Sequence, residues 1–473
     1  MRALSSQPCR LLRLRTIARR TRDNPSHRFF TTLAIETSCD DTAVAVLTRT
    51  SPSHASLLYN DRIASDNRAF KGVHPGTAVI GHATALAKLV QRAIDHLPKP
   101  SEEHAASLRK RLCYAQDGTP RLAPDFVSVT RGPGMSKNLG IGIDTAKGLS
   151  LAWGVPLVGV HHMQAHALTP QLVTALNSST SSATTHDVTT TTQTSSPAPH
   201  FSFLSLLVSG GHTQLVLSSD LTTHRILATT IDNAIGNLLD QTARLILPSD
   251  LITSAPDVMY GRLLESFAFP PEDTDPYAFF TPCASRAEEM VAVPTGYDWS
   301  ISLPFRESKE VAFSFSGIYS TVERITSTNP DMSIPERRTL ARHTLSSAFR
   351  HLVGRICLAI EADPATLLPA LRSALVVAGG VASNRFLMHV LRKTLAVRVP
   401  QLGGELNVVS PPIELCTDNA AMIAWTGMRM FEEGWYTDLS VLPIAKWPMD
   451  PTHGPGLLGV DGWLRREGFE TIA

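Results

Sequence analysis

Hydrophobic and polar positions alternate with period two in two separate parts of the chain. Each part predicts a pair of strands joined by a short tip, at residues 37–42 and 209–213. The strands are residues 33–36 and 43–47 in the first pair, and 204–208 and 214–217 in the second. The sequence therefore predicts two β-hairpins of the same design.

Helical periodicity follows each hairpin, at residues 82–97 and 136–153 after the first and at 235–247 and 335–362 after the second. Two sheets that each begin with a hairpin and continue through helices predict an internally duplicated, two-lobed α/β fold. Ligands of such folds bind between the lobes, at hairpin tips and helix starts. The predicted parts are an N-terminal lobe over 31–170 and about 415–445, a C-terminal lobe over 200–414, and a C-terminal tail over 446–473.

Three segments lack this patterning. Residues 177–199 contain 14 serines and threonines among 23 residues and predict a disordered insertion. Residues 248–304 mix proline, acidic and aromatic residues and predict an irregular insertion with one helical patch near Tyr260. Residues 1–30 contain eight arginines, no lysine and one acidic residue, which is typical of a mitochondrial transit peptide; a basic arm that binds nucleic acid is the alternative.

Composition limits the remaining possibilities. At 473 residues and 43% hydrophobic content, the chain can bury the large core of an enzyme. Its net charge of +1 becomes about −6 without residues 1–30, so a nucleic acid would have to bind at a local basic patch. No run of about 18 uncharged apolar residues occurs, and a membrane span is not predicted.

Two histidines, His162 and His166, stand four residues apart at the start of a predicted helix. This spacing places both imidazoles on one helical face, where they can bind one metal ion, although paired histidines also occur without a metal. Asp418, ahead of an apolar helix, is a candidate third ligand, and a helix cap is the alternative. Such a donor set suits zinc, iron, manganese or magnesium.

Glycine-rich turns predict a nucleotide site. Ser209, Gly210 and Gly211 offer consecutive backbone N–H groups, which form a candidate anion-binding nest. Asn384 follows a second glycine pair at a helix start, and Asp240 lies on a helix where its carboxylate could bind a ribose or form a surface salt bridge. The Walker A lysine with its serine or threonine is absent, which excludes a P-loop.

Seven short motifs occur in a fixed order: IETSCDD at 35–41, RGPG at 131–134, HMQAH at 162–166, LLVSGGHTQL at 206–215, FSFSG at 313–317, GGVASN at 379–384 and TDN at 417–419. This set resembles the universal tRNA threonylcarbamoyladenosine synthases. The resemblance covers residues 32–445 apart from the two irregular regions, and the combination of motifs is highly specific.

The resemblance implies an actin-like and Hsp70-like two-lobed ATPase fold. It also implies an acyltransferase that moves a threonylcarbamoyl group from threonylcarbamoyl-adenylate to the N6 amino group of adenosine 37, in tRNAs that read codons beginning with A. A homodimer without accessory subunits is implied as well. With the N-terminal segment, the resemblance points to a member in the mitochondrial matrix.

The resemblance also assigns site residues. His162, His166 and Asp418 match the ligands of one divalent metal ion. The residues that match the adenylate site are Leu207, Val208, Ser209, Gly210, Gly211, Asp240 and Asn384, with Gly261 and Glu265 matching a further motif of some members.

The catalytic residues stay open, with Glu36 and Asp41 at the first hairpin tip as candidates. The family usually has glutamate where this chain has Asp41, and a lysine near the position of Tyr319. Two other functions use the same features. A metallopeptidase could use the histidine pair but lacks the glutamate that follows the first histidine in zincins. A non-catalytic nucleotide-binding protein could share the fold, and the complete set of metal ligands disfavours it.

Overall fold

The computed structural model describes residues 30–70, 72–100, 112–180, 198–403 and 406–466. The predicted transit peptide, apart from its last residue, Phe30, and most of the predicted serine- and threonine-rich insertion lie outside the described residues. Within those residues, no helix combines the length and the apolarity that crossing a membrane requires.

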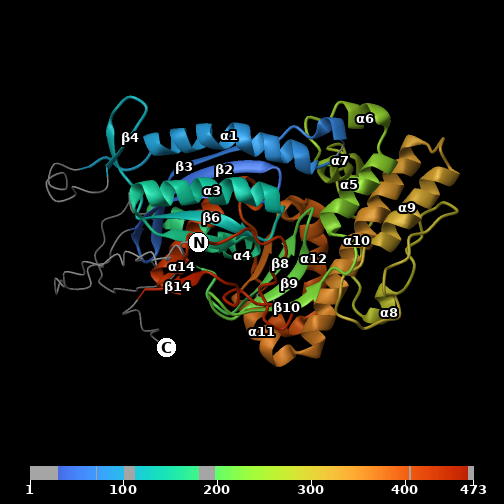
Figure 1. Ribbon diagram of the computed structural model, residues 1–473. Coiled ribbons are helices and arrows are strands. Elements are labelled where there is room, and N and C mark those ends of the chain that lie inside the picture. Colours follow the sequence, from blue (N-terminus) through green and yellow to red (C-terminus); the bar gives the residue numbers. More distant parts are fainter. Residues whose placement is uncertain (1–29, 71, 101–111, 181–197, 404–405, 467–473) are drawn as a thin grey trace, which may run out of the picture.

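The N-terminal lobe is built on a seven-stranded sheet with the order β14-β13-β7-β6-β1-β2-β3, on the left of Figure 1. The first predicted hairpin is confirmed, because β1 and β2 pair in antiparallel fashion, while β6 lies parallel to β1 and β7 lies parallel to β6. The strands are β1 Thr31–Glu36, β2 Asp41–Ser51, β3 His54–Ala64, β6 Phe126–Gly132, β7 Leu157–His161, β13 Trp435–Thr437 and β14 Trp463–Arg465.

The C-terminal lobe contains a five-stranded sheet with the order β10-β9-β8-β11-β12. The second predicted hairpin is confirmed as the antiparallel pair β8 and β9, and β11 lies parallel to β8. The strands are β8 Phe203–Val208, β9 Thr213–Ser218, β10 His224–Thr229, β11 Leu375–Ala378 and β12 Val408–Val409; a separate small hairpin pairs β4 Leu112–Tyr114 with β5 Pro120–Leu122.

The two sheets repeat one topology. The strands β3-β2-β1-β6-β7 match β10-β9-β8-β11-β12 in order and in direction: the consecutive pairs on one side of β1 or β8 are antiparallel, and those on the other side are parallel. The predicted internal duplication is therefore confirmed. In each unit the hairpin tip lies at the carboxyl ends of the parallel strands, where α/β folds bind ligands.

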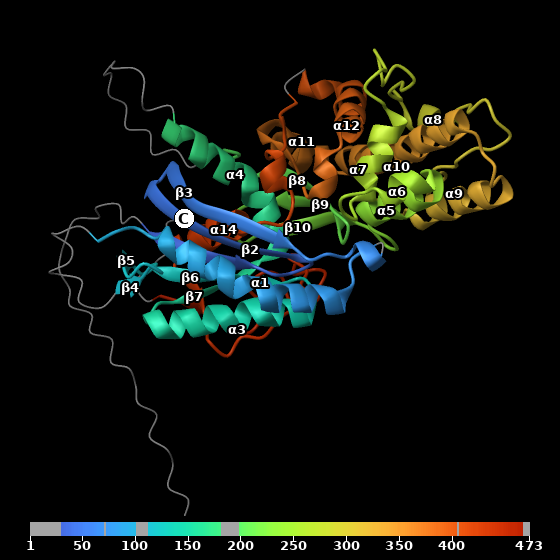
Figure 2. The same ribbon diagram turned by 90° about the horizontal axis from the view of Figure 1, so that it is seen from above.

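Helices cover both sheets, and one layer of helices packs against both of them. Leu33 and Ile35 of β1 pack toward α1 and α3, whereas Ala34 faces a cluster that contains α4 and α14. The same cluster includes Phe203 and Leu207 of the C-terminal sheet, so α4 and α14 connect the two lobes. Figure 2 shows α4 beside β3 and next to β8. The bounds are α1 Pro75–Asp95, α3 Ser136–Trp153, α4 His162–Thr180 and α14 Ala420–Glu432.

The other face of the C-terminal sheet packs Leu204, Leu206 and Val208 against a large helical subdomain. Its elements are α5 Ile235–Ile246, α6 Ser249–Thr253, α7 Tyr260–Ala268, α8 Arg286–Glu289, α9 Ser316–Thr328, α10 Ile334–Ala362, α11 Pro364–Ser373 and α12 Arg385–Arg398. Short segments complete the chain: η1 Arg68–Phe70, η3 Gly380–Ser383, η4 Pro400–Leu402 and α13 Ile413–Cys416.

Two segments are more firmly anchored than their irregular patterning indicates. Residues 248–304 carry α6, α7 and α8, and the buried Glu289 pairs with Arg286 at 2.6 Å and Arg398 at 3.4 Å. The predicted tail supplies β14 to the N-terminal sheet. Asp450 in this tail accepts a hydrogen bond from Ile226 N–H of β10 at 2.7 Å, so the tail also contacts the C-terminal lobe.

Candidate metal and nucleotide site

The histidine pair lies where β7 runs directly into α4. His162 is the first residue of the helix and His166 follows one turn later, so both rings lie on the same face. The ring centroids are 4.7 Å apart, and both side chains are buried. Strand β7 thus fixes the helix start that carries the pair.

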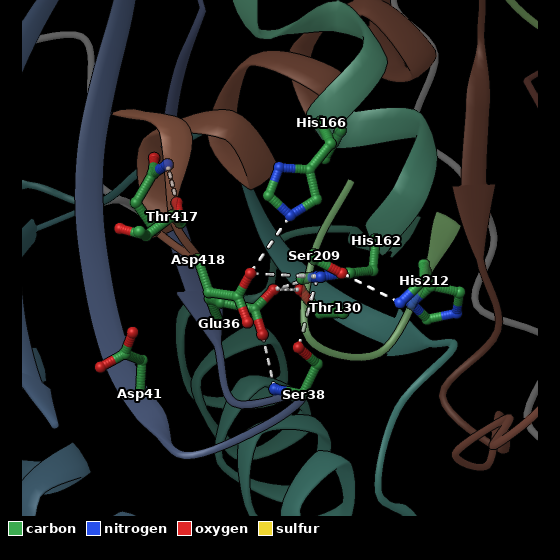
Figure 3. Close-up of polar contacts among 12 residues, drawn as sticks. Glu36, Ser38, Asp41, Thr130, His162, His166, Ser209, His212, Thr417 and Asp418 are labelled. Carbon is green, nitrogen blue, oxygen red and sulfur yellow. Dashed lines mark hydrogen bonds and ion pairs between the residues drawn. The ribbon is translucent and has the colours of Figure 1, made fainter. Parts of the chain in front are cut away.

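Asp418 reaches this face from the short connection between α13 and α14. The N-cap of α14 is its neighbour Asn419, whose Oδ1 accepts the Met422 N–H at 3.0 Å. The capping alternative for Asp418 is therefore wrong, and its carboxylate is available to the histidines. Asp418 Oδ1 lies 3.4 Å from His162 Nε2 and 3.1 Å from His166 Nε2 (Figure 3).

These three side chains fit a metal ion. Their candidate ligand atoms lie within 4.8 Å of one another, and they form the one group of this kind within the described part of the chain. Donors about 2.0–2.1 Å from a tetrahedral ion lie roughly 3.3–3.4 Å apart, close to the two distances from Asp418. Three protein donors leave coordination positions open, as in catalytic sites.

Glu36 contacts His162 at Nδ1, the ring nitrogen that does not face Asp418. The parallel register of β1 and β6 pairs Ile35 with Val129, which brings the next residues, Glu36 and Thr130, together. The buried Glu36 carboxylate lies 3.1 Å from His162 Nδ1 and accepts hydrogen bonds from Ser38 N–H and the Thr130 hydroxyl. A carboxylate at Nδ1 orients the ring and leaves Nε2 to bind a metal.

Burial and neighbouring charges act in opposite directions on the ionisable groups of the site. Burial opposes the charged form of His162, but Asp418 and Glu36 outweigh it and raise the pKa of His162 to about 10. Burial likewise opposes ionisation of Asp418, and the charge of His162 reverses this effect and holds the pKa of Asp418 well below its usual range. The candidate ligand set therefore contains an ion pair, which a bound metal ion would have to replace.

Asp41 lies beside the ligands without contacting the histidines (Figure 3). Burial raises its pKa to about 7, with Arg62 opposing the shift and Asp418, Asp40 and Glu36 adding to it. Its Oδ2 accepts a hydrogen bond from Arg62 at 3.1 Å. Of the two candidate catalytic carboxylates, Glu36 orients a ligand, and Asp41 forms an ion pair at the edge of the site.

The second hairpin tip offers backbone groups. Leu207 and Val208 are buried strand residues whose side chains belong to the core, whereas Gly210 and Gly211 are exposed. A turn between Ser209 and His212 is closed by hydrogen bonds in both directions, at 2.8 and 3.1 Å. A Cβ atom at Gly210 or Gly211 would meet no atom within 4 Å, so the space beside both glycines is open.

The remaining predicted nucleotide residues form a chain of hydrogen bonds at helix starts. Asp240 Oδ1 accepts the Gly261 N–H at the start of α7 at 2.7 Å. Glu265 Oε1 accepts the Phe386 N–H at the start of α12 at 3.0 Å, and the N-cap of that helix is Asn384. Burial raises the pKa of Asp240 to about 6 and also raises that of Glu265. The structure thus brings these four positions together.

His212 joins the two halves of the site. It lies beside His162 in Figure 3, although it comes from the C-terminal tip. Burial and the nearby charges of His162 and His166 lower its pKa to about 4, so the ring is neutral at neutral pH. The motif at 206–215 contained His212, but sequence reasoning gave it no role. Thr130 and Arg62 were also missed, since their contacts depend on strand pairing.

Comparisons with known proteins identify the family of this chain. The profile of the tRNA N6-adenosine threonylcarbamoyltransferase family matches residues 115–183 and 181–425. The mitochondrial tRNA N6-adenosine threonylcarbamoyltransferase of Schizosaccharomyces pombe is 33% identical over 93% of this chain and 91% of its own length. The tRNA N6-adenosine threonylcarbamoyltransferases of Bartonella henselae and Chelativorans sp. are 31% and 32% identical, over 89% of this chain and 96% of their own lengths. The resemblance inferred from the motifs is therefore confirmed, and this chain belongs to the tRNA N6-adenosine threonylcarbamoyltransferase family.

Proposed function

We propose that this protein transfers the threonylcarbamoyl group of threonylcarbamoyl-adenylate to the N6 amino group of adenosine 37 in mitochondrial tRNAs that read codons beginning with A. One observation carries the proposal: His162, His166 and Asp418 converge from two distant segments at a point beside Ser209 of the second hairpin tip (Figure 3). The candidate metal ligands and the candidate anion nest would then contact the same substrate molecule.

The first half of the proposed mechanism belongs to the N-terminal lobe. His162, His166 and Asp418 would hold one divalent ion, which when bound acts as a Lewis acid toward the phosphate and carbamoyl oxygens. Glu36 keeps a proton on Nδ1 of His162, so Nε2 remains a ligand. The ion's identity stays open among zinc, iron, manganese and magnesium, because all four accept nitrogen and oxygen donors.

The second half belongs to the C-terminal lobe. The backbone N–H groups of Gly210 and Gly211 would bind the phosphate oxygens, and the Asp240 and Asn384 region would hold the nucleoside. The N6 nitrogen of the adenosine forms a bond to the carbamoyl carbon, the bond from this carbon to the phosphate oxygen breaks, adenylate leaves, and the proton that N6 loses passes to the departing phosphate or to solvent. His212, whose ring lies beside His162 and is neutral at neutral pH, would offer a further hydrogen-bonding group at this place.

The metallopeptidase alternative lacks a general base. Met163, which follows the first histidine, is buried in the core, and Gln164 donates a hydrogen bond to the Leu221 carbonyl oxygen at 2.8 Å. Glu36 is engaged by His162, the Ser38 N–H and the Thr130 hydroxyl. Helix α4 therefore contains no carboxylate that could activate water, and Glu36 is occupied by its three partners.

Mass spectrometry of nucleosides from purified mitochondrial tRNA tests the function. A strain without this protein should lose N6-threonylcarbamoyladenosine from these tRNAs, and the wild-type gene should restore it. Normal levels in the deletion strain would contradict the proposal. Cleavage of casein by the purified protein would favour the peptidase instead.

The proposal also includes the cellular location and the oligomeric state of the protein. The arginine-rich N-terminal segment and the mitochondrial relative support a site of action in the mitochondrial matrix. The protein would act there as a homodimer, with tRNA and threonylcarbamoyl-adenylate as its substrates. Fractionation of mitochondria and light scattering of the purified chain check the two points separately.

A further inference from the structure

Arg62 lies near the end of β3, opposite Ala43 of β2 and at the edge of the candidate metal site. Its Nη1 donates one hydrogen bond to Asp41 Oδ2 at 3.1 Å and another to Thr417 Oγ1 at 2.6 Å. Thr417 directly precedes the candidate ligand Asp418. The guanidinium is therefore fixed between the first hairpin tip and the segment that supplies the third ligand.

These two hydrogen bonds use a single nitrogen of the guanidinium. Nε and Nη2 of Arg62 have no hydrogen-bond or ion-pair partner among the residues that the structure describes. The side chain is 39% exposed, so this edge is accessible from solvent. A guanidinium edge with two nitrogens binds a carboxylate through two parallel hydrogen bonds.

The surroundings of Arg62 are otherwise acidic. Glu36, Asp40 and Asp418 all lie close enough to Asp41 to affect its ionisation. Within the described ranges, Arg62 is the one lysine or arginine that has a hydrogen bond or ion pair with Asp41 or with residues 417–418. An anionic group that enters the site at this edge therefore meets Arg62 as its cationic partner.

We propose that Arg62 binds the carboxylate of the threonyl part of the substrate, an inference that rests on the proposed function. The threonylcarbamoyl group carries this carboxylate a few bonds from the carbamoyl carbon, which reacts beside His162, His166 and Asp418. Arg62 makes and breaks no covalent bond. It determines specificity, because it selects a carbamoyl group that bears an amino-acid carboxylate, and its planar fork suits this task better than a lysine.

A purely structural role for Arg62 is the competing explanation, since the same two hydrogen bonds brace Asp41 against Thr417. The two roles differ in their dependence on the ligand. If Arg62 only holds Asp41 and Thr417 in place, its loss weakens the binding of every ligand of the site equally. If Arg62 binds the carboxylate, its loss weakens the binding of only those ligands that carry a carboxylate.

Calorimetric binding to the metal-loaded full-length protein separates the two roles. The probes are a non-transferable sulfamoyl analogue of threonylcarbamoyl-adenylate and the same analogue with a carboxamide in place of the threonyl carboxylate. Arg62→Ala should weaken binding of the carboxylate analogue by about 10- to 100-fold, the range of charge-assisted hydrogen bonds. The carboxamide analogue should bind wild type and Arg62→Ala within about threefold of each other, and Arg62→Lys should recover part of the loss.

Arg92→Ala is the matched control, because it removes an exposed arginine of the same lobe that pairs with Asp61 at 2.7 Å. It should bind both analogues like wild type. Equal losses of both analogues in Arg62→Ala and Arg62→Lys would overturn the inference in favour of a brace, and no loss of either would overturn it as well. A wild-type protein that binds neither analogue would instead overturn the proposed function itself.

Discussion

The two hairpin tips come from the same duplicated five-stranded unit, yet they carry opposite chemistry. The β1–β2 tip and its neighbours present charged side chains, including the buried Glu36 and the candidate ligands His162, which is buried, and Asp418, which is half-buried. The β8–β9 tip presents exposed backbone at Gly210 and Gly211. Duplication thus supplied two equivalent positions, and sequence divergence made one a candidate metal site and the other a candidate anion nest.

The largest difference between the tips should follow from removing a metal ligand. His162→Ala leaves two donors, so metal binding and transfer activity should fall together by about 100-fold or more. Inductively coupled plasma mass spectrometry and a tRNA transfer assay measure the two quantities. His96→Ala, at the exposed C-cap of α1, is the matched control and should retain both.

If His162→Ala lost the metal but kept its transfer activity, the candidate metal site would have no role in the reaction.

Removing the charge of Glu36, which contacts the candidate ligand His162, should have a smaller effect on metal binding. Glu36→Gln keeps the shape of the side chain but removes the charge that faces His162 Nδ1, so metal affinity should fall about 10- to 100-fold. Competition with a chelating dye measures the affinity. Glu432→Gln changes a carboxylate that pairs with Arg49 elsewhere in this lobe and should leave the affinity unchanged. Equal affinities of wild type and Glu36→Gln would show that Glu36 has no supporting role.

The glycine tip should respond to an added methyl group in a position-dependent way. Gly210→Ala places its Cβ in open space, so the fold should keep its stability while the adenylate binds about tenfold more weakly. Gly236→Ala would bring a Cβ within 2.6 Å of the Ser209 carbonyl oxygen and should lower the free energy of unfolding by about 1–3 kcal/mol.

Urea denaturation and ligand titration of both variants test this distinction. An unchanged adenylate affinity in Gly210→Ala would mean that the ligand does not occupy the space beside the tip.

The smallest expected effect is a pH dependence of opposite sign at the two tips of the metal-free protein. The pKa of His162 is raised to about 10, so its contribution to stability is complete below about pH 6.5 and is lost as pH rises through about 10. The pKa of His212 is lowered to about 4, so its contribution is present above about pH 6.5 and is lost as pH falls through about 4.

Urea denaturation of wild type, His162→Gln and His212→Gln across this range should show two trends of opposite direction. Trends of the same sign would contradict the assigned charge states.

Local patterns predicted the features that depend on neighbouring residues. The two hairpins, α3 and the face shared by His162 and His166 all follow from short-range periodicity. The helix α1 begins at Pro75, earlier than its apolar pattern indicates, because His74 caps a polar first turn. Strand β3 was not predicted, since its half-exposed positions alternate only weakly.

Contacts between segments far apart in the chain could not be predicted from the sequence. The hydrogen bond from Thr130 to Glu36 spans 94 positions and depends on the register of β1 against β6. That from Arg62 to Thr417 spans 355 positions and depends on how α14 packs on the first sheet. Motif resemblance supplied Asp418 as the third ligand, whereas spacing alone left a helix cap as the alternative.

Metal removal from the wild-type protein tests the central claim most directly. The protein is treated with a chelator, its metal content is measured, and its transfer of the threonylcarbamoyl group to tRNA is followed before and after a divalent metal is restored. The site formed by His162, His166 and Asp418 predicts that transfer is lost with the metal and returns with it. Full transfer by the metal-free protein would contradict the account.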